Sequence, residues 1–146
     1  MLFNSYMSKK IIITGGLGYI GTELCKLYSG VSWHHKIKVI DNRFISERVN
    51  QIRNWNMDFI QGNILDKDFI NKHFKDADVV HHLAGITSVP RTKSESSVEK
   101  DKEIRTVGVE GTKNILDAIS EKCKIIFPST HVVYEGIDKV KTDIKE

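Results

Sequence analysis

The residues best suited to chemistry in this chain are the glycines of segment 14–21, which reads TGGLGYIG and directly follows an apolar run. Gly15, Gly18 and Gly21 are spaced three residues apart, and the segment also contains the pattern G-x-G-x-x-G. Glycines in this arrangement let backbone N–H groups approach a pyrophosphate at the start of a helix. The segment therefore predicts a phosphate-binding turn between a strand and a helix.

An acidic residue follows at the spacing expected for a dinucleotide site. Asp41 closes the second apolar run, 20 residues after Gly21. An acid at about this distance meets the ribose hydroxyls of a bound dinucleotide. The alternative is a glycine-rich turn in some other α/β domain. The strand, turn, helix, second strand and acid occur here in the order that a dinucleotide site requires, which favours the first interpretation.

Length and composition are typical of one folded domain covering residues 1–146, of which residues 1–8 are expected to be flexible. The net charge is +3, with 22 basic and 19 acidic residues, a balance that does not favour nucleic acid as a partner. No apolar run has the length of a membrane span, and the first residues lack a signal-peptide pattern. Cys25 and Cys123 form no paired motif, which favours a reduced, cytoplasmic protein.

The remaining pattern alternates strands and helices, which predicts a parallel sheet with right-handed crossovers. The expected order is 3-2-1-4-5, in a doubly wound, three-layer α/β/α fold of the Rossmann type. Asp66 is a candidate N-cap for the third helix. Strands are expected at 10–14, 37–40, 57–61, 78–84 and 124–128, and helices at 19–28, 46–55, 66–74 and 94–121.

Two features of this pattern bear on packing. The helix expected at 94–121 has an inward stripe comprising Val98, Val107, Gly111, Ile115 and residues 118–119. The adjacent histidines at 81 and 82 lie on a strand, where neighbours point to opposite faces, so they do not chelate one metal ion. No metal site is predicted, and the second of these histidines is expected to pack in the structure.

Five segments together resemble the extended short-chain dehydrogenase/reductases, and among them the nucleotide-sugar epimerases and dehydratases. Segment 14–21 is similar to the family's T-G-G-x-G-Y-I-G, and each of the others is similar to a further family motif in the family's order. These others are GNILD at 62–66, HLAG at 82–85, VGVEGTKN at 107–114 and PSTHVVY at 128–134.

The resemblance implies a role for each matching position. The glycines and the two residues that begin the helix would hold the pyrophosphate, and residues after the second strand would take the adenosine ribose. Others would flank the adenine or line the cofactor at the end of the fourth strand. The implied cofactor residues are Gly15, Gly18, Tyr19, Ile20, Gly21, Asp41, Asn42, Arg43, Asn63, Ile64, Leu83, Ala84 and Gly85.

The expected cofactor is NAD, with NADP less favoured. A 2′-phosphate beside the carboxylate of Asp41 would be repelled. Arg43 works against this choice, because an arginine two residues further on can swing to a phosphate. Asn63 stands where the family usually has an aspartate, and its side-chain carbonyl can still accept a hydrogen bond from the adenine amino group.

The resemblance also implies chemistry that depends on residues further along. Thr130 matches the catalytic Ser/Thr of the family, whereas the alternative is a strand-end threonine satisfied by backbone. The family's general base is the tyrosine of Tyr-x-x-x-Lys, but Tyr134 is followed four residues later by Asp138. Tyr6 and Lys10 have the spacing but precede the first strand.

We therefore expect the NAD-binding part of a nucleotide-sugar epimerase or dehydratase, without its C-terminal substrate region and inactive as this chain. The substrate of the complete enzyme would be a nucleotide sugar. The resemblance implies a homodimer through the helix near 94–121. Two alternatives stay open: a stand-alone, non-catalytic dinucleotide sensor, and a reductase of the same superfamily with a non-sugar substrate.

Overall fold

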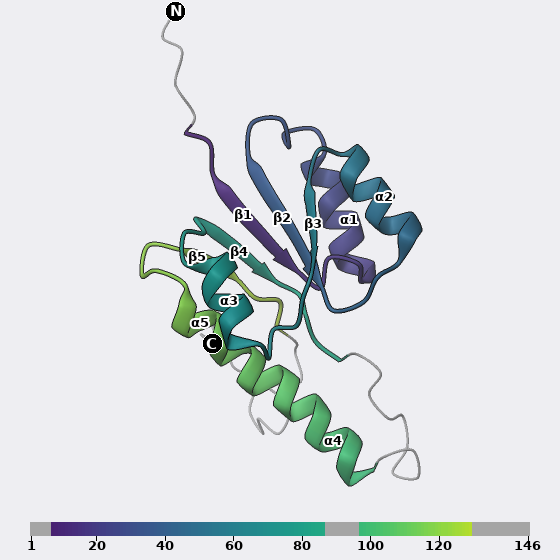
Figure 1. Ribbon diagram of the computed structural model, residues 1–146, viewed down its shortest axis with the longest axis vertical. Helices are drawn as coiled ribbons and strands as arrows, with labels where there is room; N and C mark the ends of the chain where they lie inside the picture. Colours follow the sequence, from purple (N-terminus) through teal and green to yellow (C-terminus); the bar gives the residue numbers. More distant parts are fainter. Residues whose placement is uncertain (1–6, 87–96, 130–146) are drawn as a thin grey trace, which may run out of the picture.

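The computed structural model describes residues 7–86 and 97–129 and has a five-stranded parallel sheet at its centre (Figure 1). The strand order β3-β2-β1-β4-β5 confirms the predicted order 3-2-1-4-5. The strands are β1 (Lys10–Thr14), β2 (Lys36–Asp41), β3 (Asp58–Gln61), β4 (Val79–His82) and β5 (Lys124–Ile126).

The sheet is buried on both faces, because alternate residues of its strands enter two separate hydrophobic clusters. On β1, Ile11 and Ile13 join one cluster, whereas Ile12 joins the other. All three side chains are at most 3% exposed. A central strand of a parallel sheet is expected to be apolar along its whole length for this reason.

Helices cover both faces and complete the three layers of the predicted Rossmann-type fold. Helices α1 (Tyr19–Tyr28) and α2 (Ser46–Asn54) contribute Cys25, Val49 and Ile52 to the first cluster. Helices α3 (Lys67–Phe74) and α5 (Thr112–Ala118) contribute to the second cluster. The predicted N-cap of α3 is confirmed, since the Asp66 carboxylate accepts a hydrogen bond from the Phe69 amide at 3.0 Å.

The helix expected at 94–121 is continuous from Val98 to Ala118 but changes its winding. It comprises α4 (Val98–Arg105), the π-helical segment η2 (Thr106–Gly111) and α5. The predicted end was three residues too late, because Ile119 already has extended backbone. Residues 94–96 lie outside the described residues, as do residues 1–6.

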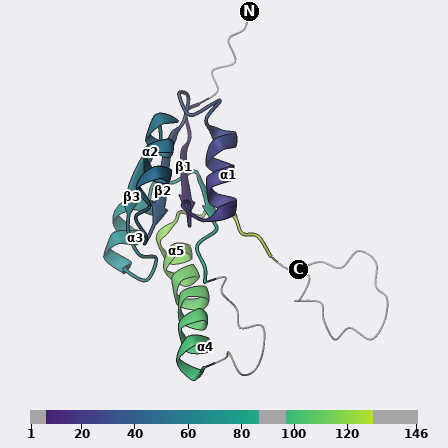
Figure 2. The same ribbon diagram turned by 90° about the vertical axis from the view of Figure 1, so that its right-hand side faces the viewer.

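The inward stripe predicted for this helix is confirmed only in its second half. Gly111 and Ile115 are buried, and Val107 packs against the second cluster. Val98 was wrongly placed, since its side chain is 81% exposed. The reason is visible in Figures 1 and 2, where α4 projects beyond the sheet, so that no layer of the described residues covers it. No helix in the described part of the chain is long and apolar enough to cross a membrane.

Candidate dinucleotide-binding site

The three glycines of the first crossover are required for three different steric reasons. Gly15 has φ +65°, and a Cβ there would lie 2.7 Å from the Leu83 carbonyl oxygen. Gly21, in the first turn of α1, packs directly on the turn, and its Cβ would lie 2.7 Å from the Cα of Gly16. A Cβ on Gly18 would approach only the Gly15 oxygen, at 3.0 Å. Thus the first glycine forms the turn, the third allows close packing, and the second leaves main chain open to a ligand.

Among the described residues, no side chain caps the start of α1 at this turn. Gly18 is its N-cap residue and provides no side-chain hydrogen bond to the first turn. Tyr19 and Ile20 follow with side chains that are 85% and 63% exposed. The first amides of a helix have no partner within the helix and carry its positive dipole end. They can therefore donate to an anion that approaches from the open side of Gly18.

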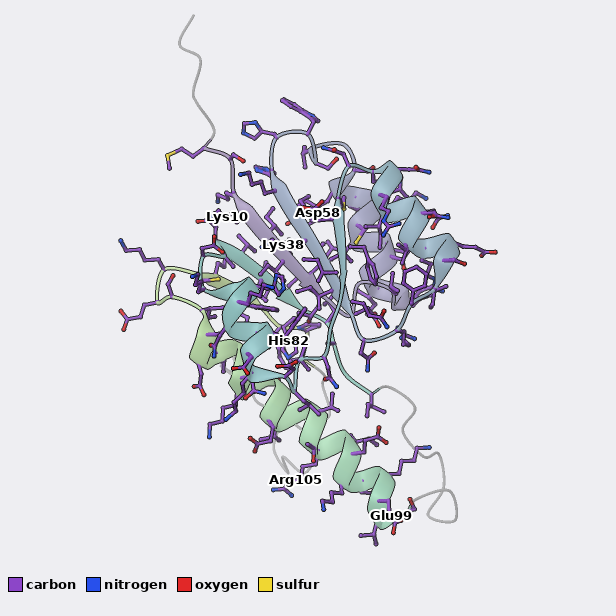
Figure 3. The ribbon with its side chains drawn as sticks, in the orientation of Figure 1. Lys10, Lys38, Asp58, His82, Glu99 and Arg105 are labelled. Atoms are coloured by element: carbon purple, nitrogen blue, oxygen red, sulfur yellow. The ribbon has the colours of Figure 1, made fainter. Side chains whose placement is uncertain are left out.

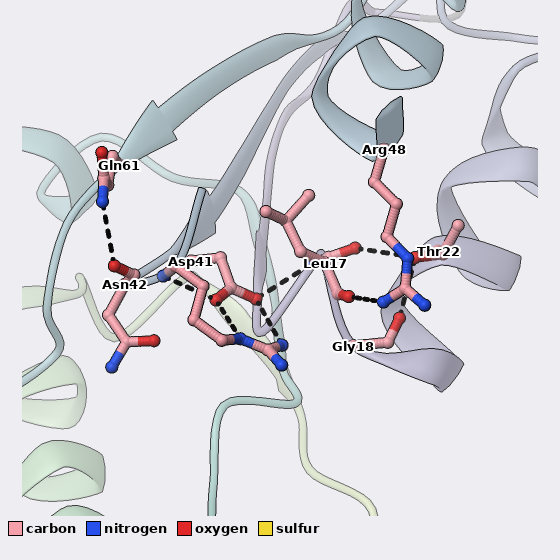
Figure 4. A network of polar contacts seen from close by, with 9 residues as sticks. Leu17, Gly18, Thr22, Asp41, Asn42, Arg48 and Gln61 are labelled. Carbon is pink, nitrogen blue, oxygen red and sulfur yellow. Dashed lines mark hydrogen bonds and ion pairs between the residues drawn. The ribbon is translucent and has the colours of Figure 1, made fainter. Parts of the chain in front are cut away.

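The carboxylate of Asp41 lies at the same turn and is almost completely buried. It ends β2, the neighbour of β1, and accepts a hydrogen bond from the Leu17 amide at 3.0 Å (Figure 4). The backbone amide of Arg43 donates to it at 3.0 Å, and the guanidinium donates at 3.1 and 3.3 Å. The hydrogen bonds from the guanidinium to the Asp41 carboxylate raise the pKa of Arg43 above its usual value. A carboxylate has about four acceptor positions, so Leu17 and Arg43 together occupy all of them.

One residue at this site was missed by sequence reasoning. Arg48, on α2, donates a hydrogen bond to the Leu17 carbonyl oxygen, so that a second guanidinium lies at the glycine turn (Figure 4). No motif spacing indicates this residue. Only the packing of α2 beside α1 brings it to the turn.

The loop after β4 forms the other side of the turn. The amides of Leu83 and Ala84 both donate to the hydroxyl of Thr14 at 3.1 Å, and that peptide lies directly against Gly15. The predicted strand 78–84 therefore ends early, at His82, and its last residues with Gly85 form a loop. Since β1 lies between β2 and β4, the end of β1 is flanked by Asp41 on one side and by this loop on the other.

The remaining implied residues lie further from the turn or beyond the described ranges. Asn42 is exposed, and its carbonyl oxygen accepts a hydrogen bond from Gln61 at 3.0 Å. Asn63 follows β3 and is exposed, with its Oδ1 accepting from the Leu65 amide at 3.0 Å. Ile64 is buried and packs against the long helix, and its carbonyl oxygen accepts a hydrogen bond from the Asn114 side chain at 3.0 Å. Thr130 lies outside the described residues.

The two histidines of β4 point to opposite faces of the sheet, as predicted. His81 contacts the Tyr28 hydroxyl at 2.8 Å, on the side of α1. His82 is 1% exposed and lies between Thr14 and Thr112, at 2.9 Å from each hydroxyl. Burial lowers the pKa of both imidazoles below their usual value. Among the described residues, no group of three or more His, Cys, Asp or Glu side chains lies close enough to hold a metal ion.

A shallow cavity of about 270 Å³ lies away from this turn, at the opposite end of β1. Lys10, Lys38, His73 and Asp76 are among its lining residues, and Lys10 forms an ion pair with Asp76. Figure 3 shows Lys10 and Lys38 towards the other end of the sheet from His82. In open α/β sheets ligands bind at the carboxyl ends of the strands, so the glycine turn and not this cavity is the candidate site.

Comparison with known proteins agrees with this geometry. The sequence profile of the 3-beta hydroxysteroid dehydrogenase/isomerase family matches residues 12–143. The chain is 35% identical over 130 residues to a UDP-N-acetyl-alpha-D-glucosaminuronate decarboxylase from Bacillus cytotoxicus, covering 88% of this chain and 38% of that protein. It is 30% identical over 143 residues to a UDP-glucose 4-epimerase from Neisseria meningitidis serogroup C, covering 90% of this chain and 40% of that protein.

Solved structures show the same fold. A UDP-glucose-4-epimerase from Stenotrophomonas maltophila with bound NAD superposes with a TM-score of 0.70 at 23% identity, covering 92% of this chain and 40% of that one. The chain thus spans about 40% of the length of these relatives. On the profile match, the motifs and the fold, the chain belongs to the 3-beta hydroxysteroid dehydrogenase/isomerase family, within the extended short-chain dehydrogenase/reductases that include the NAD-dependent nucleotide-sugar epimerases and dehydratases.

Proposed function

We propose that this chain binds NAD at the glycine turn, as the nucleotide-binding part of an enzyme that acts on a nucleotide-linked sugar. One observation carries the proposal. At the end of β1, open main chain at Gly18 and the first amides of α1, which no side chain of the described residues caps, lie next to the buried carboxylate of Asp41. A phosphate group and a ribose diol, in that order, are what such donors and such an acceptor select.

The pyrophosphate would lie over Gly18 and accept hydrogen bonds from the amides of Tyr19 and Ile20. The adenosine ribose would donate to Asp41, which requires the Arg43 side chain to leave two of the carboxylate positions. The loop of Leu83, Ala84 and Gly85 would line the path towards the nicotinamide. Asn42 would lie near the ribose, and Asn63 and Ile64 would flank the adenine. NAD, when bound, supplies a hydride acceptor for oxidation of a sugar hydroxyl.

We favour NAD over NADP because a 2′-phosphate would meet the carboxylate of Asp41. Arg43 and Arg48 both lie near enough to this carboxylate or to the turn to offset part of that repulsion. The relatives support the nucleotide-sugar assignment, since they include a decarboxylase and epimerases named for UDP-linked sugars. The name of the matching family favours a second candidate, a dehydrogenase with a steroid or other non-sugar substrate.

Calorimetric titration of the 146-residue chain with NAD and with NADP tests the cofactor proposal. We expect NAD to bind at least about tenfold more tightly, a difference of about 1.4 kcal/mol. Asp41→Asn should reduce the preference, because it removes the charge and keeps one oxygen to accept from Leu17. Asp76→Asn, at the opposite end of β1, is the matched control and should leave both affinities unchanged. Tighter binding of NADP, or no binding of either, would contradict the proposal.

We further propose that the 146-residue chain alone does not turn over, and that Thr130 contacts substrate in a catalytically complete form. Its sequence contains no Tyr-x-x-x-Lys pair after the fifth strand. Measurable epimerase, dehydratase or decarboxylase activity of the purified chain would refute this.

A homodimer through the long helix is proposed as well, since Val109 and Leu116 are 54% and 50% exposed on it. A purely monomeric species in sedimentation would argue against that dimer.

A further inference from the structure

The hydroxyl of Thr14 has its hydrogen-bond direction fixed by its neighbours. It is completely buried, and the amides of Leu83 and Ala84 both approach it at 3.1 Å. An amide can only donate, and a hydroxyl has two acceptor positions and one proton. Both acceptor positions are therefore used, so the proton of Thr14 must be donated to Nδ1 of His82, at 2.9 Å.

The opposite end of the same chain of contacts gives the same direction independently. The hydroxyl of Thr112 lies 2.6 Å from the carbonyl oxygen of Gly108, which can only accept. Thr112 therefore donates to this carbonyl, and its oxygen accepts from Nε2 of His82 at 2.9 Å. The two ends agree on one state of the imidazole, which is neutral with its proton on Nε2.

We propose that His82 is a positioning residue of the NAD site. With its proton on Nε2, it fixes the direction of the Thr14 hydroxyl and connects that hydroxyl to Thr112 in the long helix. This inference rests on the proposed NAD site for its consequence, but the hydrogen-bond arrangement itself can be tested without NAD.

The consequence for the site follows from what the Thr14 hydroxyl holds. The Leu83–Ala84 peptide lies against Gly15 so closely that a Cβ on this glycine would be 2.8 Å from the Ala84 nitrogen. A change in the Thr14 hydroxyl therefore moves the loop that forms one side of the turn. A His82 ring that carries a proton on Nδ1 faces a hydroxyl with no free acceptor position, so one of the two loop amides must be released. The Leu83 amide also donates to the Thr14 carbonyl oxygen at 3.3 Å, so the amide that loses its acceptor is that of Ala84.

The groups that contact the His82 ring in the described part of the chain are uncharged. Its neighbours are Thr14 on β1, Thr112 on α5 and the ring of Phe127 after β5, whose centroid lies 5.4 Å away. No charged side chain of the described residues contributes to the lowering of its pKa, which is due to burial alone. The neutral state that the hydrogen bonds require is therefore also the state that burial favours.

The first test is direct observation of the tautomer and of the loop amides in the 146-residue chain without NAD. In ¹⁵N NMR spectra, Nε2 of His82 should resonate as a protonated nitrogen and Nδ1 as an unprotonated one. His82→Phe should speed hydrogen exchange of the Ala84 amide about tenfold, and that of the Leu83 amide less, since the latter also donates to the Thr14 carbonyl oxygen. His82→Asn, whose Oδ1 can accept from Thr14 in place of Nδ1, should keep exchange within about threefold of the wild type.

The matched control is His81→Phe, the adjacent histidine on the opposite face of β4, which should lower stability through loss of its Tyr28 contact but leave both amides protected. Should His82→Phe fail to fold, Thr112→Val removes the acceptor of Nε2 and should move protonation towards Nδ1, with Thr112→Ser restoring it. A proton on Nδ1 in the wild type, or amides that respond equally to the His81 and His82 variants, would overturn the proposal.

The second test connects the arrangement to the cofactor. His82→Phe should weaken NAD binding at least about fivefold, and His82→Asn and His81→Phe should leave it within about twofold. Unchanged NAD affinity in His82→Phe would refute the positioning role. If the wild type binds no NAD, the proposed function fails, and the tautomer and amide exchange still decide whether His82 holds the loop.

Discussion

The open main chain at Gly18 gives the sharpest prediction, because a methyl group there should affect NAD and spare the fold. Gly18 has φ −71° and ψ 174°, a conformation that any residue adopts. The added Cβ would meet only the Gly15 oxygen, at 3.0 Å, a contact that a shift of a few tenths of an ångström relieves. Replacing glycine also lowers the conformational entropy of the unfolded chain, which stabilises the folded state by about 0.4–1 kcal/mol. The two effects oppose each other, so stability should change by less than about 1 kcal/mol.

Gly21→Ala, in the same motif, should instead destabilise the fold. In Gly21→Ala the Cβ would overlap the Gly15 oxygen and lie 2.7 Å from the Gly16 Cα. These are backbone atoms, so the turn itself must move, at a cost of about 1–3 kcal/mol or more. Alanine regains about 1 kcal/mol of helix propensity, which only partly offsets that cost.

The assay pairs thermal unfolding with calorimetric NAD titration on the same samples. For a chain of this size, 1 kcal/mol shifts Tm by about 2–4 °C. Gly18→Ala should keep Tm within about 3 °C and weaken NAD binding at least about tenfold. Gly21→Ala should lower Tm by several degrees. Gly30→Ala is the matched control, since nothing lies within 4 Å of its Cβ position; it should leave NAD binding unchanged and raise Tm by at most a few degrees.

Two results would refute the reasoning. If Gly18→Ala binds NAD as the wild type does, the pyrophosphate does not lie over this residue, and the proposed site is wrong in its central feature. If Gly21→Ala unfolds at the wild-type temperature, the close packing of α1 on the turn does not limit this position. A drop in Tm with Gly30→Ala would show that the control itself carries an unrecognised cost.

Three further predictions follow from the described contacts. Arg43→Ala removes a side chain that occupies the carboxylate, so the Kd for NAD should fall about two- to fivefold in calorimetry, whereas an unchanged Kd would mean that Arg43 does not compete. Burial lowers the pKa of His81 and His82 in the folded chain, so the unfolded chain binds more protons below about pH 6.5. The free energy of unfolding should therefore decline as pH falls from 7 to 5, which urea midpoints measured across this range would show. The decline should be less steep in the double variant His81→Asn with His82→Asn. Asp66→Ala removes the cap of α3 and should lower the free energy of unfolding by about 1 kcal/mol in urea, and a loss of NAD binding would contradict its purely structural role.

The sheet and its order could be predicted because parallel strands carry a strong local signal. An apolar run such as residues 11–13 indicates a strand buried on both faces, and repeated β-α units leave few topologies. The end of β4 was predicted two residues too late, because Leu83 and Ala84 are apolar but donate to the Thr14 side chain. Val98 was wrongly placed for a related reason, since periodicity does not show where a helix runs past its sheet.

The glycine turn and Asp41 were found from spacing, whereas their partners were not. The sequence places Arg43 two residues after Asp41, but only the structure shows its guanidinium bound to that carboxylate. Arg48 reaches the turn from a different helix, and His82 connects two threonines that are far apart in the sequence. Such contacts depend on how elements pack, and no local pattern records them.

Because α4 projects beyond the sheet, the two ends of the long helix differ in local stability. No residue of α4 is buried among the described residues, and Ser97 caps its start, whereas α5 is anchored by Ile115 and by Gly111 against the side chain of Ile64. Local unfolding of the long helix should therefore start at Val98 and proceed towards the sheet, ending at the buried residues Gly111 and Ile115. A protease should therefore cut the chain first within α4, and the two fragments should stay together through the pairing of β4 with β5.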